Sequence, residues 1–99
     1  MVSQLRRTLV DSFSSIEAAF LEFAAPDVQN ALQTLINNGA KQIYIYPYFL
    51  NSGKHVHNDI PTIIQETKNN NPETILELLP HFGSSPHILS VITNDLKDL

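Results

Sequence analysis

Residues 42–50, Gln-Ile-Tyr-Ile-Tyr-Pro-Tyr-Phe-Leu, form the stretch that decides the fold. Isoleucine and tyrosine are enriched in β-strands, so this stretch predicts a strand. Pro47 has no backbone N–H to give to a sheet, which predicts that pairing is interrupted near the end of the strand. Tyr44, Tyr46 and Tyr48 recur at every second position, so they share one face of the strand, where we expect them to pack.

Two other short apolar stretches predict strands, one over residues 16–23 and one over residues 74–79. Residues 16–23 are mostly apolar without clean alternation, which is typical of a strand covered on both faces. Around the strands, apolar residues recur at helical spacing. We therefore expect helices over residues 2–13, from Pro26 to the turn at Gly39, from Asn58 or Asp59 to residue 69, and from Ser85 to Leu96.

The expected helix ends carry local signals. Pro26 and Pro61 suit the first turn of a helix, where a missing N–H is tolerated. Gly39 suits the position just after a helix, where a positive φ is common. Ser85 is expected to cap the last helix. The apolar residues that should face inward are Ile60, Ile63 and Ile64 in the third helix and Ile88, Leu89, Ile92 and Leu96 in the fourth.

This alternation of helices and strands predicts an α/β fold: a small parallel sheet flanked by helices in three layers, as one domain over residues 1–99. Right-handed crossovers bring the carboxyl ends of parallel strands to the same edge of the sheet. Ligands of such sheets bind at that edge. The loops expected to meet there are residues 24–25, 51–58 and 80–85.

Composition narrows the class of protein. The chain has 99 residues and a net charge of -4, which argues against nucleic acid because phosphate binding needs a basic surface. Cysteine is absent, which excludes disulfides and thiolate metal sites. No apolar stretch approaches the roughly 20 residues of a membrane span, and the N-terminus does not resemble a signal peptide. We expect a cytoplasmic protein that contacts neither membrane nor nucleic acid.

The loop after the central strand holds His55 and His57 together with Asn51, Ser52 and Lys54. Neutral imidazole is the commonest protein ligand for borderline divalent metals, so this loop predicts a metal-handling site. His57 is alternatively a solvated loop residue.

Three other ionisable residues lie near the expected edge. Asp59 either orients a histidine ligand or caps the next helix. Glu22 lies near the end of the first expected strand and should point at the ligand edge, because burial of its charge elsewhere would be costly. There it is a plausible proton acceptor. His81 could approach the same edge or play a structural role.

Two ionisable residues are assigned no part in the site. Glu17, at the start of the first expected strand, is expected at the opposite edge of the sheet. His87, just inside the last helix, is expected to be a surface residue.

The chain resembles the small sirohydrochlorin chelatases, the short cobaltochelatase and ferrochelatase relatives of the class II chelatases. The resemblance covers nearly the whole chain in order. Its most specific part is the block Phe-Leu-x-x-Gly-x-His-Val-x-x-Asp-Ile-Pro, residues 49–61. The other matching elements are Phe20-Leu21-Glu22, Pro26, Gly39-Ala40, Pro47-Tyr48, Phe82-Gly83 and Pro86.

The resemblance implies insertion of a divalent metal, Co²⁺, Fe²⁺ or Ni²⁺, into the tetrapyrrole sirohydrochlorin, for cobalamin or sirohaem synthesis. It implies no nucleotide cofactor and no prosthetic group. His55 would bind the incoming metal and help to remove the pyrrole protons, with Glu22 as the assisting base or metal guide. The residues of the same loop that we expect to contact the bound ligand are Leu50, Ser52, Gly53 and Val56.

The chain departs from the family pattern at its start. The family begins with a strand that ends in His-Gly-Ser, whose histidine is the second of the metal site, and these 99 residues include no such strand. In the flavodoxin-like order it would lie between the first two strands expected here. We therefore expect a chelatase-like half that is N-terminally truncated relative to the family. The resemblance to the short members implies pairing as a homodimer. The alternative is a non-catalytic relative that binds metal or tetrapyrrole.

Overall fold

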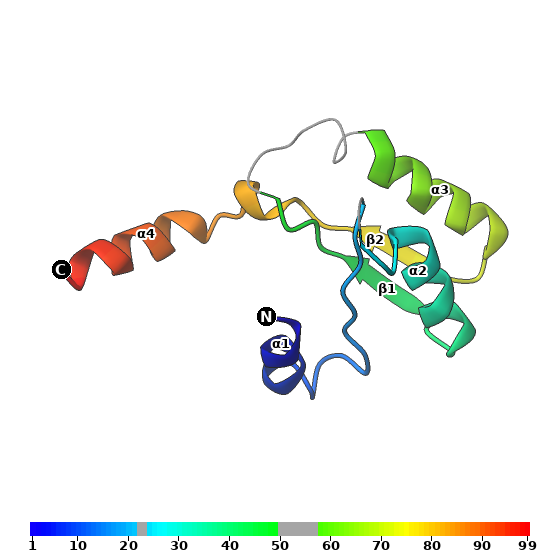
Figure 1. Ribbon diagram of the computed structural model, residues 1–99, viewed down its shortest axis with the longest axis horizontal. Coiled ribbons are helices and arrows are strands. Elements are labelled where there is room, and N and C mark those ends of the chain that lie inside the picture. Colours follow the sequence, from blue (N-terminus) through cyan, green and yellow to red (C-terminus); the bar gives the residue numbers. More distant parts are fainter. Residues whose placement is uncertain (22–23, 50–57) are drawn as a thin grey trace. The chain divides into compact units, whose positions relative to one another are not determined.

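A computed structural model describes residues 1–21, 24–49 and 58–99 of the chain. These residues form two compact units, Met1–Gly39 and Ala40–Leu99. The first unit contains the helices α1 and α2, and the second contains the strands β1 and β2 with the helices α3, η2 and α4 (Figure 1). Each unit is described by itself below.

The helix α1 covers Val2–Thr8, which is shorter than the helix expected over residues 2–13. After α1 the chain closes a separate turn, in which the amides of Ser12 and Phe13 both donate to the carbonyl of Leu9, at 2.9 and 3.0 Å. Two donors on one carbonyl end the regular ladder, because an α-helix gives each carbonyl one amide.

The helix α2 covers Val28–Asn37 and has a defined cap at each end. The side chain of Asp27 accepts a hydrogen bond from the amide of Asn30 at 2.8 Å. Pro26 therefore lies before the cap and not in the first turn, which corrects the sequence expectation. Gly39 follows the helix with a φ of 100°, as predicted, because glycine adopts this conformation without steric cost.

The strand expected over residues 16–23 does not form in residues 16–21, the part of it that the structure describes. An isolated parallel bridge joins Phe20 to Asp27, where the amide of Phe20 donates to the carbonyl of Pro26 at 3.0 Å. A strand needs a neighbour to satisfy its backbone groups. Within the described residues, the pairing of this stretch is limited to the bridge between Phe20 and Asp27.

In the second unit, β1 (Gln42–Ile45) and β2 (Ile75–Leu78) pair in parallel, with Gln42 opposite Ile75 and Ile45 opposite Leu78. This confirms the predicted parallel sheet, which has two strands within the described ranges. β1 ends two residues before Pro47, as the proline predicts.

The helix α3 (Ile60–Asn70) packs on β2. It buries Ile60, Ile64 and Thr67, while the sheet contributes Ile43 and Leu76 to the same core. The prediction that Ile60 and Ile64 face inward is confirmed. Pro61 lies in the first turn, as expected. The core of this unit is therefore the contact between one helix and one face of a parallel sheet.

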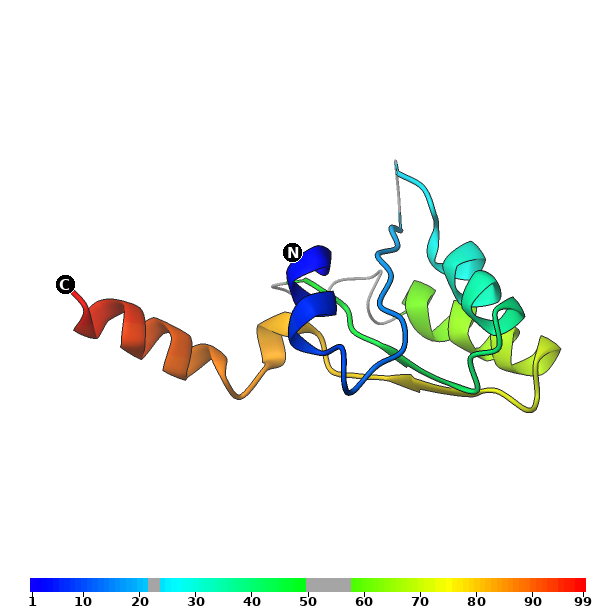
Figure 2. The ribbon, with the colours of Figure 1, turned by 90° about the horizontal axis from the view of Figure 1, so that it is seen from below.

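The helix α4 (Ile88–Lys97) follows the short 3₁₀ helix η2 (Phe82–Ser84). It begins later than expected, because Ser85 uses its hydroxyl to accept from the amide of His87 at 3.2 Å in a turn before the helix. Figures 1 and 2 both show α4 extending beyond the end of the sheet, away from α3. Among the described residues of α4 none is buried.

The exposure of α4 corrects the expectation that its apolar stripe faces the core. Leu89 is 72% exposed, and Ile92 and Leu96 are also exposed. Tyr44 and Tyr46 are exposed as well, although their spacing suggested packing. No helix in the described part of the chain is long and apolar enough to cross a membrane.

Candidate functional site

The carboxyl edge of the sheet is held together by backbone hydrogen bonds that continue beyond the two strands. The amide of Leu79 donates to the carbonyl of Ile45 at 2.9 Å. Further on, Phe82 donates to Pro47 at 2.9 Å, and Gly83 donates to Phe49 at 2.8 Å. The segment after β2 therefore lies directly beside the segment after β1, which is where parallel sheets bind their ligands.

An aromatic pair lies at this edge. The rings of Tyr48 and Phe82 have centroids 5.3 Å apart and planes inclined by 72°, an edge-to-face contact. Tyr48 remains 62% exposed, whereas Phe82 is half-buried. Pro47, which lies between β1 and Tyr48 in the sequence, is buried. Its fixed φ limits how the backbone just before Tyr48 can move.

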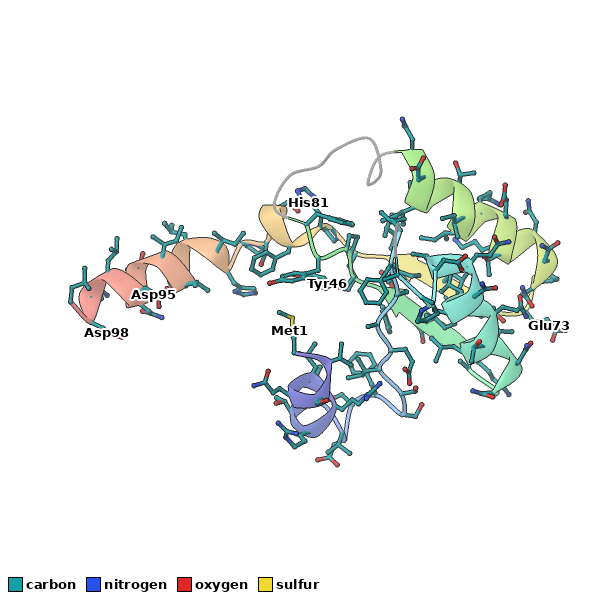
Figure 3. All side chains as sticks on the ribbon, viewed as in Figure 1. Met1, Tyr46, Glu73, His81, Asp95 and Asp98 are labelled. Atoms are coloured by element: carbon teal, nitrogen blue, oxygen red, sulfur yellow. The ribbon has the colours of Figure 1, made fainter. Side chains whose placement is uncertain are left out.

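His81 lies at the same edge. It is half-buried and precedes η2, where its carbonyl accepts from the amide of Ser84 at 3.0 Å and from the hydroxyl of Ser84 at 2.8 Å. Figure 3 shows Tyr46 and His81 at the end of the sheet where both strands finish. His81 therefore lies at the ligand edge, and its carbonyl has a structural part in η2; whether its side chain takes part in the site stays open.

The residues predicted to carry the chemistry lie outside the described residues. These are His55 and Glu22 as metal ligands and catalytic groups, and Leu50, Ser52, Gly53 and Val56 as ligand contacts. His57 lies outside them as well. Within the described part of the chain, no group of three or more His, Asp or Glu residues is placed to hold a metal. The metal site therefore stays a prediction from sequence.

Asp59 occupies the position before α3 and is half-buried. Its backbone is already helical, and its side chain makes no cap hydrogen bond to the described part of α3. The predicted position of the cap is therefore confirmed, but the predicted contact is not formed. The first turn is tied instead by Thr62, whose hydroxyl donates to the carbonyl of Asn58 at 2.7 Å.

The two residues assigned no site role are placed by the structure. Glu17 accepts a hydrogen bond from the guanidinium of Arg6 at 3.1 Å, with both side chains about half exposed. An exposed pair of this kind contributes only about 0–1 kcal/mol to stability. His87 lies exposed at the start of α4. Neither observation adds a group to the candidate site.

Sequence reasoning missed the Tyr48–Phe82 pair. The tyrosine spacing predicts packing for Tyr48, and Phe82 stands out in the sequence only as part of the family-like element Phe82-Gly83. The available signal was that both residues belong to the family-like elements and follow strands at the same edge of the sheet. What could not be read from sequence is the register, which places residue 82 beside residue 47.

Comparison with known proteins identifies the family. A protein-family model described as CbiX matches residues 1–99. Sirohydrochlorin ferrochelatase of Priestia megaterium is 28% identical over 82 residues, which are 83% of this chain and 31% of that protein. Sirohydrochlorin cobaltochelatase of Saccharolobus solfataricus is 38% identical over 52 residues, which are 52% of this chain and 41% of that protein. The matched regions thus span less than half the length of these relatives.

Solved structures show the same fold. A putative cobalamin (vitamin B12) biosynthesis CbiX protein from Marinobacter aquaeolei superposes with a TM-score of 0.74 at 24% identity, over 97% of this chain and 79% of that one. SirB from Bacillus subtilis with Fe³⁺ gives a TM-score of 0.72 at 20% identity, over 97% of this chain and 39% of that one. The small α/β fold predicted from sequence is thereby confirmed. Because the CbiX family model matches residues 1–99, the chain belongs to the CbiX family.

Proposed function

We propose that the chain is a sirohydrochlorin chelatase, which inserts Co²⁺ or Fe²⁺ into the tetrapyrrole for cobalamin or sirohaem synthesis. The observation that carries this proposal is the match of all 99 residues to the CbiX family model. It is supported by the sequence block of residues 49–61, in which His55 stands six positions after Phe49.

The reaction sets clear chemical demands. As the divalent metal enters, the macrocycle loses two N–H protons, so the site must both hold a cation and accept protons. In this proposal His55 binds the incoming metal through a neutral imidazole, which is a good ligand for both Co²⁺ and Fe²⁺. Glu22 accepts a proton or guides the metal. The net charge of -4 favours the approach of a cation.

The direct test is anaerobic incubation of the protein with sirohydrochlorin and Co²⁺ or Fe²⁺, followed by absorbance. We expect metal insertion by the wild-type chain and a loss of at least 100-fold in His55→Ala, since general acid–base residues contribute about 10²–10⁴-fold. His87→Ala is the matched control, because His87 lies exposed at the start of α4. Equal rates for wild type and His55→Ala would refute the assignment.

A second candidate function is binding without catalysis. The observation that favours it is the absence from these 99 residues of a strand ending in His-Gly-Ser. Calorimetric titration with sirohydrochlorin and with Co²⁺ separates the two candidates. Tight binding without turnover supports the binding module, and measurable turnover excludes it.

We further propose that residues 1–99 act as one domain of a homodimer. Support comes from the lengths of the matched proteins. The superposition on SirB with Fe³⁺ includes 97% of this chain but only 39% of the SirB chain. A second copy would supply a comparable amount of chain. Sedimentation equilibrium tests this directly, and a monomer at all concentrations would contradict it.

A further inference from the structure

Aromatic side chains lie along the carboxyl edge of the second unit. Tyr46 is 52% exposed and Tyr48 is 62% exposed, and both lie in the segment that follows β1. Phe82, from the segment after β2, contacts Tyr48 edge-to-face with centroids 5.3 Å apart. Packing within the unit leaves more than half of the Tyr48 side chain open to solvent.

The backbone around Tyr48 is tied on both sides, and its ring contacts the ring of Phe82. Hydrogen bonds from Phe82 to Pro47 (2.9 Å) and from Gly83 to Phe49 (2.8 Å) bracket Tyr48 on both sides. Pro47 is buried and restricts the backbone before it. An exposed ring that is held in place loses little conformational entropy when a ligand stacks on it, which favours binding.

We infer that Tyr48, braced by Phe82, is a stacking contact for the macrocycle of the tetrapyrrole substrate. This inference rests on the proposed function and names one further substrate-binding residue for it. A tetrapyrrole offers a broad, flat π-system and polar groups at its rim. A tyrosine ring suits both, because its face is apolar and its hydroxyl can bond to a carboxylate.

The location agrees with this role. Ligands of parallel α/β sheets bind outside the carboxyl ends of the strands, and Tyr48 follows the end of β1 at Ile45 by three residues. His55, the residue proposed to handle the metal, comes seven positions later in the sequence. A ring that holds the macrocycle and a residue that delivers the metal are thus contributed by one continuous segment.

The test is a titration with sirohydrochlorin, followed through the absorbance of the macrocycle and through protein fluorescence. The chain has three tyrosines and no tryptophan, so intrinsic fluorescence reports only on Tyr44, Tyr46 and Tyr48. We expect strong quenching in the wild type. Tyr48→Leu should raise Kd about tenfold, the size of a lost aromatic stacking contact, whereas Tyr48→Phe should stay within about threefold.

Ile75→Ala is the control, because Ile75 is an exposed apolar residue of the same unit and lies at the amino end of β2, away from the carboxyl edge that holds Tyr48. It should leave Kd unchanged, and far-UV circular dichroism should be the same for all variants. In metal insertion, Tyr48→Leu should raise KM for the tetrapyrrole and change kcat less than about twofold, because the ring binds substrate without touching the metal.

The two proposals fail in different ways. If the wild type binds sirohydrochlorin and Tyr48→Leu binds equally well, the stacking contact is refuted while the chelatase proposal stands. If Tyr48→Leu changes the oligomeric state of the protein in solution but not its Kd for sirohydrochlorin, the ring belongs to a protein interface and the inference is also refuted. If the wild type binds no tetrapyrrole, both proposals fall.

Discussion

The helices α3 and α4 are similar in sequence pattern and differ in what covers them. Both belong to the second unit, and they have 11 and 10 residues with apolar residues at helical spacing. α3 packs on β2 and buries Ile60, Ile64 and Thr67. α4 buries none of its described residues. The pattern of a helix thus predicts which face is apolar, but the fold around it decides whether that face is covered.

The difference has an energetic consequence. An isolated helix shorter than about 12–15 residues is marginal in water, so most of its stability in a protein comes from packing of its apolar face. α3 obtains this stabilisation from the sheet. α4 obtains little within the described part of the unit, and its stripe of Leu89, Ile92 and Leu96 is available to a partner.

The largest effect is expected for truncation in α3. Ile64 is 6% exposed, so Ile64→Ala should lower the free energy of unfolding by about 2–4 kcal/mol, through lost burial and the cavity left behind. Urea denaturation measures the change. If Ile64→Ala does not fold, Ile64→Val should still show a loss of about 0.5–1.5 kcal/mol.

The matched control for this prediction is Leu89→Ala in α4. Leu89 is 72% exposed, so its truncation should change stability by less than about 0.5 kcal/mol. Equal losses for Ile64→Ala and Leu89→Ala at low protein concentration would mean that α4 is covered within a single chain, and the comparison would then be wrong.

The next effect concerns the homodimer. If a second copy covers the stripe of α4, Ile92→Lys places a charge against apolar surface and should raise the dimer dissociation constant at least about tenfold, or 1.4 kcal/mol. Asn94→Lys, on the same helix, is the control with the same charge. Analytical ultracentrifugation measures the dimer dissociation constant of both variants. An equal effect of the two substitutions would indicate electrostatic repulsion, and would remove the stripe from the interface.

The sequence predicts individual elements well where the signal is local. Pro47 marks the end of β1, Gly39 marks the end of α2, and Pro61 marks the first turn of α3, each because of its own backbone chemistry. The strand expected over residues 16–23 illustrates the limit. Its residues have the right character, but a strand forms only beside a neighbour, and residues 16–21 have one isolated bridge, between Phe20 and Asp27, in place of a neighbouring strand.

The same limit applies to the candidate site. The motif around His55 predicts a function because its spacing matches a known family, whereas the contact between Tyr48 and Phe82 depends on a register that residues 34 positions apart do not encode locally. Exposure is equally non-local. The period of the tyrosines identifies their common face, but whether anything covers that face depends on elements elsewhere in the chain or in a partner.

The smallest effect tests what kind of surface α3 buries. Thr67 is buried, and its hydroxyl donates to the carbonyl of Ile63 at 2.8 Å, one turn earlier in the same helix. That carbonyl also accepts the backbone hydrogen bond of the helix, so loss of the Thr67 hydroxyl leaves no buried group without a hydrogen bond. Thr67→Val should therefore change stability by less than about 0.5 kcal/mol, because an apolar group of the same shape replaces the hydroxyl.

Thr67→Ser keeps the hydroxyl and removes the buried methyl group, so it should cost about 1 kcal/mol. Thr93→Ser in α4 is the control and should cost less, since none of the described residues of that helix is buried. Urea denaturation ranks the three variants by their loss in free energy of unfolding. A larger loss for Thr67→Val than for Thr67→Ser would show that the hydroxyl contributes more than the buried methyl group, and the contrast with α4 would then rest on hydrogen bonding within α3.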